Sequence, residues 1–140
     1  RKRLASYKSK TSATPSATTT GKVAVFATCY GNYNKPDMVE DLVAVMEHNE
    51  IPTTLVHKEQ CCGMPKLELG DLEAVAAAKE ANIPQLLKMI DDGWDIVGPI
   101  PSCVLMFKQE LPLMFPNDPD CPTMLTRSAL PSIFLILMSI

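Results

Sequence analysis

The stretch KVAVFATCYGNYN, residues 22–34, decides how this chain folds. Its first half is an almost unbroken apolar run that ends at Cys29, and such runs are typical of strands buried on both faces in a parallel sheet. Its second half supplies Gly31, Asn32 and Asn34, which are residues that favour turns. The stretch therefore predicts a buried strand that is followed directly by a cysteine and a turn.

Two further strands are predicted along the chain, with helical patterns between them. TTLVH, residues 53–57, is rich in β-branched residues and leads into the loop KEQCCGMP, and WDIVGPIPS, residues 94–102, is the third candidate. A helix is predicted from Pro36 to Asn49, because proline suits a first turn and apolar residues follow at helical spacing. A long helical stretch is predicted to begin near Asp71, a suitable N-cap.

The end of the pattern contains two prolines that bear on helix length. Pro84 must kink the long helix or begin a second one. Ser102 is expected to cap a last helix over 103–114, which Pro112 could close early. The order is then β-α-β-α-β-α with short connections. This order predicts an α/β fold, namely a Rossmann-like three-layer domain with a short parallel sheet.

Four cysteines follow the three predicted strands. Cys29 ends the first strand, Cys61 and Cys62 lie a few residues beyond the second, and Cys103 follows the third. Since functional groups of parallel sheets gather beyond the carboxyl ends of the strands, all four are expected at the C-terminal edge of the sheet. Four thiolates suit zinc or an iron–sulfur cluster. Any one of these cysteines is equally well interpreted as a small core residue, but the set of four favours ligands.

Charge and composition exclude several classes of function. Residues 1–22 carry six basic and no acidic side chains, and the rest of the chain carries seven basic and 16 acidic ones. An acidic domain is a poor partner for phosphate backbones, so we expect no nucleic-acid partner, and residues 1–21 are predicted to be a flexible basic linker. Five cysteines disfavour an extracellular disulfide framework and indicate reduced thiols in the cytoplasm. Nucleotide-binding and serine-hydrolase motifs are absent from the sequence.

Three segments together resemble the cysteine-rich CCG domain. They are FATCYGNYNKPDMVEDLVAVMEHNEI, CCGMPKLELGDLEAV and PSCVLMFKQELPLMF. The CCG domain occurs in the B-type subunit of heterodisulfide reductase, in the C-type subunit of anaerobic glycerol-3-phosphate dehydrogenase, and in related lactate and glycolate oxidase subunits. The resemblance is strongest to the glycerol-3-phosphate dehydrogenase type. It covers residues 22–117 and leaves residues 118–140 as an irregular or aberrant tail.

The resemblance implies an iron–sulfur electron-transfer module in a larger oxidoreductase, either an anaerobic respiratory dehydrogenase or a heterodisulfide-reductase-like complex. Such a module passes electrons between a dehydrogenase and a quinone or disulfide acceptor. The implied ligands are Cys29, Cys61, Cys62 and Cys103, and the implied cofactor is a 4Fe–4S cluster. The implied partners are dehydrogenase or other redox subunits and a ferredoxin-like domain upstream of Arg1. The implied location is the cytoplasm, with peripheral association at the inner face of the membrane through those partners.

Two departures and two alternatives accompany the resemblance. The fullest form of the motif ends in CxxC, but Met106 stands three positions after Cys103, so we expect four thiolate ligands and not five. Family members usually carry two such domains, and this chain contains one. A structural zinc-binding or metal-free docking domain without redox activity is the main alternative, and a thiol–disulfide enzyme that uses Cys61 and Cys62 is a weaker one. Cys121 lies outside the pattern and is predicted to be a free surface thiol.

Overall fold

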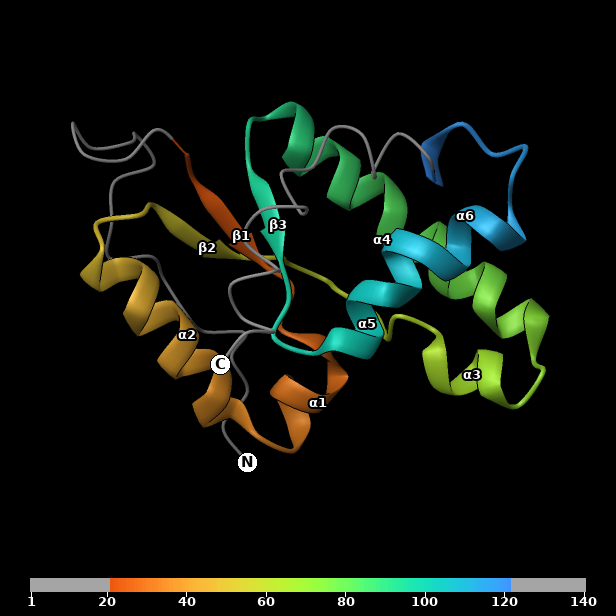
Figure 1. The fold of residues 1–140 in the computed structure, drawn as a ribbon, viewed down its shortest axis with the longest axis horizontal. Coiled ribbons are helices and arrows are strands. Elements are labelled where there is room, and N and C mark those ends of the chain that lie inside the picture. Colours follow the sequence, from red (N-terminus) through yellow and green to blue (C-terminus); the bar gives the residue numbers. More distant parts are fainter. Residues whose placement is uncertain (1–20, 122–140) are drawn as a thin grey trace.

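A short parallel sheet organises the fold (Figure 1). The computed structural model describes residues 21–121, so the predicted linker before Gly21 and the predicted tail from residue 122 lie outside the described residues. The strands are β1 (Val23–Val25), β2 (Thr53–Leu55) and β3 (Asp95–Val97), in the spatial order β2-β1-β3. Both neighbours of β1 run parallel to it. The prediction of an α/β domain with a short parallel sheet is confirmed, although each strand is shorter than predicted.

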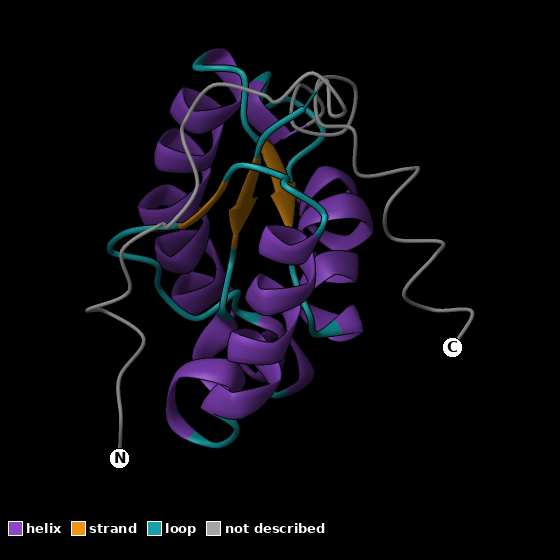
Figure 2. Cartoon of the chain, turned by 90° about the vertical axis from the view of Figure 1, so that its left-hand side faces the viewer, coloured by secondary structure: helices purple, strands orange, loops and turns teal. Residues whose placement is uncertain are grey.

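Side chains of β1 point alternately into two separate cores, as the pleat of a strand requires. Val23 and Val25 pack in a core with side chains of α2 (Pro36–His48). Ala24 packs on the opposite side, in a core to which α4 (Leu72–Asp91) contributes most of its buried side chains. Figure 2 shows helices on both sides of the strands. The predicted three-layer arrangement is therefore confirmed.

Both long helices begin where the sequence indicates. Pro36 is the first residue of α2, and the side chain of Asp71 caps α4 by accepting a hydrogen bond from the Ala74 N–H at 3.1 Å. α4 continues through Pro84 as one helix, so a second helix starting there is wrong. Ile83 and Leu86 are buried on either side of the proline, and this packing keeps the two halves together. Within residues 21–121, no helix combines the length and the apolar character needed to cross a bilayer.

Two short helices were not predicted, and each follows a residue with positive φ. α1 (Thr28–Tyr33) replaces the predicted turn and begins at Thr28, whose φ is 70°. α3 (Met64–Glu68) follows Gly63, whose φ is 95°. A single residue in this region redirects the chain sharply. Helices of five or six residues are too short for a hydrophobic period to reveal them.

The last helix has three parts: α5 (Pro101–Leu105), a π-helical turn η2 (Met106–Glu110) and α6 (Leu111–Met114). It begins two residues earlier than predicted, with Ile100 as its N-cap and without a side-chain cap, so the role predicted for Ser102 is wrong. Proline at the first helical position needs no N–H partner, which explains the earlier start. In the π-helical turn, the N–H of Leu111 bonds to the carbonyl of Met106, and the helix passes Pro112 without ending.

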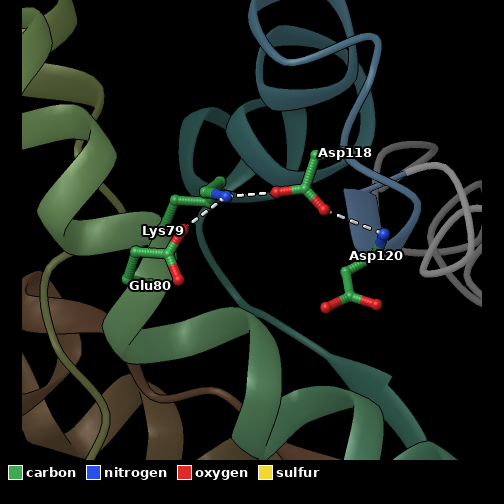
Figure 3. Close-up of polar contacts among 4 residues, drawn as sticks. All are labelled: Lys79, Glu80, Asp118 and Asp120. Carbon is green, nitrogen blue, oxygen red and sulfur yellow. Dashed lines mark hydrogen bonds and ion pairs between the residues drawn. The ribbon is translucent and has the colours of Figure 1, made fainter.

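A buried lysine joins α4 to the loop that follows α6 (Figure 3). Lys79 is only 7% exposed. Its ammonium group pairs with Asp118, pairs with Glu80 at 2.6 Å, and lies 4.9 Å from the centroid of the Phe115 ring. The hydrogen bond with Asp118 raises the pKa of Lys79, and the same bond lowers the pKa of Asp118. These contacts fasten the loop to the domain.

Cys121 lies in this fastened loop and is 1% exposed. It packs in the core shared with α4, and burial raises the pKa of its thiol. Cys121 is a free thiol, as predicted, but its predicted place on the surface is wrong. The contact that buries it joins Lys79 and Asp118, which are 39 residues apart, so no local pattern could indicate it.

We expect Lys79→Met to lower the free energy of unfolding by about 1–2 kcal/mol, because Asp118 loses its cation while the aliphatic packing of the side chain is kept. Urea unfolding followed by circular dichroism measures the change. Lys88→Met on the exposed side of the same helix is the control, with an expected change under about 0.5 kcal/mol. Equal losses in the two variants would contradict a special role for the buried lysine.

Candidate metal centre

The four predicted ligand thiols lie on three segments at one end of the sheet. Cys29 is in α1, Cys61 and Cys62 precede α3, and Cys103 is in α5. Because the three strands are parallel, the segments that follow them leave the same edge. Figure 1 shows α1, α3 and α5 gathered at that edge. The structure therefore brings together residues that are separated by more than 70 positions in the sequence, from Cys29 to Cys103.

The thiols contact one another in two pairs. The sulfur atoms of Cys29 and Cys61 are 4.0 Å apart, and the thiols of Cys62 and Cys103 are hydrogen-bonded to each other. Cys29, Cys62 and Cys103 also line one cavity. Cys62 and Cys103 are buried, at 3% and 6% exposure, whereas Cys29 and Cys61 are partly exposed. The set thus has an inner pair and an outer pair.

The inner pair is divided into a thiolate and a thiol. The hydrogen bond from Cys103 lowers the pKa of Cys62 to about 6, with smaller help from the backbone N–H of Met64 and against the effect of burial. The same hydrogen bond raises the pKa of Cys103 well above its usual value. Burial, followed by the proximity of Cys61, raises the pKa of Cys29. One ligand is therefore already a thiolate at neutral pH, and thiolate is the form that binds metal.

A strained residue sets the position of Cys29. Thr28 is 1% exposed and has a φ of 70°, a region that β-branched residues rarely occupy. Its hydroxyl oxygen accepts a hydrogen bond from the N–H of Gly31 at 3.2 Å. A Cβ atom at Gly31 would lie 2.6 Å from Cγ2 of Val39, so glycine is needed for α1 to pack against α2. Strain of this kind concentrates at functional sites.

The glycine of the CCG motif has a similar structural reason. Gly63 has a φ of 95°, and its carbonyl accepts hydrogen bonds from the N–H groups of Lys66 and Leu67, both at 2.9 Å. A side chain in this conformation would be strained. A Cβ atom there would also meet the terminal methyl of Met106 at 3.6 Å. Met106 is fully buried, so the position at which the fullest motif has a further cysteine holds a core residue against the CCG turn.

Glu59 and Asn32 connect the first two cysteine segments, and the sequence analysis missed this link. The side-chain amide of Asn32 donates to the carbonyl of Thr28 at 3.1 Å and to Oε1 of Glu59. Oε2 of Glu59 is buried and has no hydrogen-bond partner within the described part of the chain. Burial raises the pKa of Glu59 to about 7, although the N–H groups of Ala27 and Thr28 and the Asn32 amide act in the opposite direction. No sequence motif pointed to this carboxyl group.

The residues around the thiols fit an iron–sulfur cluster. A cavity of about 450 Å³ adjoins them, within the range of roughly 300–1,000 Å³ that is usual for ligand and cofactor sites. Among residues 21–121, no three His, Cys, Asp or Glu side chains converge on a position for one metal ion. A set of soft donors spread around a cavity suits a multinuclear group. The lining residues are Cys29, Tyr30, Cys62, Met64, Pro65, Glu68, Ile100, Ser102 and Cys103.

Comparison with known proteins agrees with this geometry. The family model described as CCG, a cysteine-rich domain, matches residues 23–108. The chain belongs to the CCG cysteine-rich domain family. The matched region begins in β1, ends in η2, and includes all four clustered thiols. The resemblance stated from the sequence is thereby confirmed.

Several relatives of this CCG domain are redox-associated proteins by name. Lactate utilization protein A of Oceanobacillus iheyensis is 30% identical over 71% of this chain and 38% of the relative, and the protein of the same name from Bacillus thuringiensis is 33% identical over 70% and 39%. The C-type subunit of the anaerobic glycerol-3-phosphate dehydrogenase of Escherichia coli K12 is 26% identical over 65% and 23%. The chain thus aligns with well under half the length of each. No solved structure matches the chain.

Proposed function

We propose that this CCG domain holds an iron–sulfur cluster through Cys29, Cys61, Cys62 and Cys103 and serves as an electron-transfer module. The observation that carries the proposal is the meeting of four thiols from three segments at the edge of a cavity. The separation into a buried thiolate and a buried thiol supports it, because the first ligand needs no deprotonation before it binds. When bound, such a cluster supplies a site that accepts and releases electrons.

The protein residues would control how the centre meets solvent and partners. Cys62 and Cys103 lie on the buried side, and Cys29 and Cys61 lie on the partly exposed side. Apolar side chains such as Met64 line the cavity beside the thiols. Burial and a low-polarity lining are among the features by which proteins set the potential of a cluster. The exposed side is where an electron donor or acceptor would approach.

The names of the relatives suggest the setting of this module. They refer to lactate utilization and to an anaerobic glycerol-3-phosphate dehydrogenase. We therefore propose that the chain works with a dehydrogenase or other redox subunits and passes electrons to a quinone or disulfide acceptor. A ferredoxin-like partner domain fits this setting, as does a place at the cytoplasmic face of a membrane reached through the partners.

A four-thiolate zinc site is the second candidate, and one distance favours it. Two thiolates bound to one tetrahedral zinc stand about 3.8 Å apart when the Zn–S distance is about 2.3 Å. The sulfur atoms of Cys29 and Cys61 are 4.0 Å apart. Against this candidate, no third side chain in residues 21–121 joins such a pair around a single ion position.

Anaerobic purification of the full chain distinguishes these candidates. We expect iron and acid-labile sulfide in about equal amounts, near four of each per chain for a 4Fe–4S cluster, with a brown colour and an EPR signal in one oxidation state. A colourless sample with one zinc per chain would overturn the electron-transfer proposal. A metal-free sample in which Cys61 and Cys62 exchange disulfides would overturn it in favour of a thiol–disulfide enzyme.

A further inference from the structure

We infer that Asn82 of α4 is a positioning residue, which holds the backbone of the Gln60–Cys61 segment so that the adjacent cysteines face the centre. The inference rests on the proposed function of that site. Asn82 is fully buried and contains no metal-binding atom of the proposed set. It acts on the site only through the backbone of the cysteine segment.

Both ends of the Asn82 amide bind this segment. Nδ2 donates to the carbonyl of Cys61 at 3.1 Å and to the carbonyl of Gln60 at 3.3 Å. Oδ1 accepts a hydrogen bond from the N–H of Gln60 at 2.9 Å. The remaining contact, from Nδ2 to the carbonyl of Ala78 at 3.0 Å, lies within α4 and fixes the orientation of the amide. One side chain therefore satisfies three backbone groups of two consecutive residues.

The chemistry of these contacts requires an amide. The cysteine segment lies between β2 and α3 and has no strand or helix partner for its backbone, so its buried N–H and C=O groups need side-chain partners. Leucine has a similar size but offers neither donor nor acceptor. Aspartate would direct carboxylate oxygens at the carbonyls of Gln60 and Cys61, which repel them. Asparagine provides a donor and an acceptor at the same end.

Gln85 adds a second contact one helical turn later. Its Nε2 donates to the carbonyl of Lys58 at 3.4 Å, to the carbonyl of Ala81 at 3.2 Å and to Oδ1 of Asn82 at 3.4 Å. α4 thus binds the segment at Lys58 and at Gln60–Cys61. The result reaches the centre because the sulfur of Cys61 lies against that of Cys29, and because Cys62 follows immediately in the chain.

Thiol alkylation of the full chain, after removal of any bound metal, tests the inference. Trypsin releases residues 59–66, which contain Cys61 and Cys62, and residues 109–127, which contain Cys121. For Asn82→Leu, we expect N-ethylmaleimide to modify the 59–66 peptide at least about tenfold faster than in the wild type, because the segment opens locally. The 109–127 peptide should stay slow, because Cys121 is buried elsewhere in the core and reports global unfolding.

Ile83→Val is the matched control, since Ile83 is buried on the same helix and touches the core without holding the segment. It should leave the 59–66 rate within about twofold of the wild type. Equal acceleration of both peptides in Asn82→Leu would overturn the inference, because the effect would then be global. If that variant does not fold, Gln85→Ala should accelerate the 59–66 peptide about two- to fivefold, and no change would overturn it.

The alkylation result is independent of whether a cluster binds. A wild type without iron, combined with selective acceleration in Asn82→Leu, would refute the proposed cluster while the positioning role stands. If the wild type binds a cluster, we expect the EPR line shape of the variant to broaden, because the backbone of two ligands is no longer held. A wild-type spectrum together with a wild-type alkylation rate would refute the positioning role and leave the cluster intact.

Discussion

Cys62→Ser is expected to abolish the iron–sulfur centre proposed for this CCG domain. A serine hydroxyl is a harder donor than a thiolate and does not deprotonate near neutral pH, so it binds iron of such a centre poorly. Cys62 is the thiolate of the buried pair, and its loss also leaves the thiol of Cys103 without its hydrogen-bond acceptor. Iron and sulfide content after anaerobic purification measures the outcome. The same loss is expected for serine at Cys29, Cys61 or Cys103.

Cys121→Ser is the matched control for this series. Cys121 is as deeply buried as Cys62, but the groups that affect its pKa are carboxylates and Lys79 and none of the other thiols. We expect the variant to keep the wild-type amounts of iron and sulfide. Circular dichroism should show that all five variants are folded. Loss of the centre in Cys121→Ser, or its retention in Cys62→Ser, would mean that the ligand set is wrong.

The edge at which the thiols meet could be predicted because it depends on local signals alone. A buried apolar run that ends at Cys29 indicates a parallel strand, and two further strands lead into the other cysteines. In a parallel sheet, those facts bring the cysteines to one edge whatever the details of the loops. The strands and long helices of the structure agree with this reasoning.

The supports of the site could not be predicted, because they join residues that are distant in sequence. Asn32 meets Glu59 across 27 positions, and Asn82 meets Cys61 across 21. A lone asparagine in a helix or a loop is ordinary, and nothing in its neighbours names its partner. The strained backbone at Thr28 is also invisible in the sequence, since threonine does not favour positive φ. Sequence patterns therefore located the centre but not the contacts that hold it.

Glu59→Gln is expected to raise the free energy of unfolding of the metal-free protein by about 3 kcal/mol at pH 8, and by less than about 1 kcal/mol at pH 5. Burial raises the pKa of Glu59 from 4.5 to about 7 in the folded state, so the folded protein holds this proton more tightly than the unfolded chain does. Stability therefore falls as the pH rises from about 4.5 to 7, where only the unfolded state loses the proton, and the cost is complete above that window.

Glutamine removes this cost because it is neutral at every pH, while its carbonyl can still accept the hydrogen bond from Asn32. Urea unfolding of both proteins at pH 5 and pH 8 measures the difference, and the effects of all other groups cancel in the comparison. Glu68→Gln, an exposed change at the same cavity, should alter stability by less than about 0.5 kcal/mol at either pH. If Glu59→Gln changes stability equally at both pH values, the carboxyl group of Glu59 is not held protonated by burial, and the link between the two cysteine segments is a plain hydrogen bond.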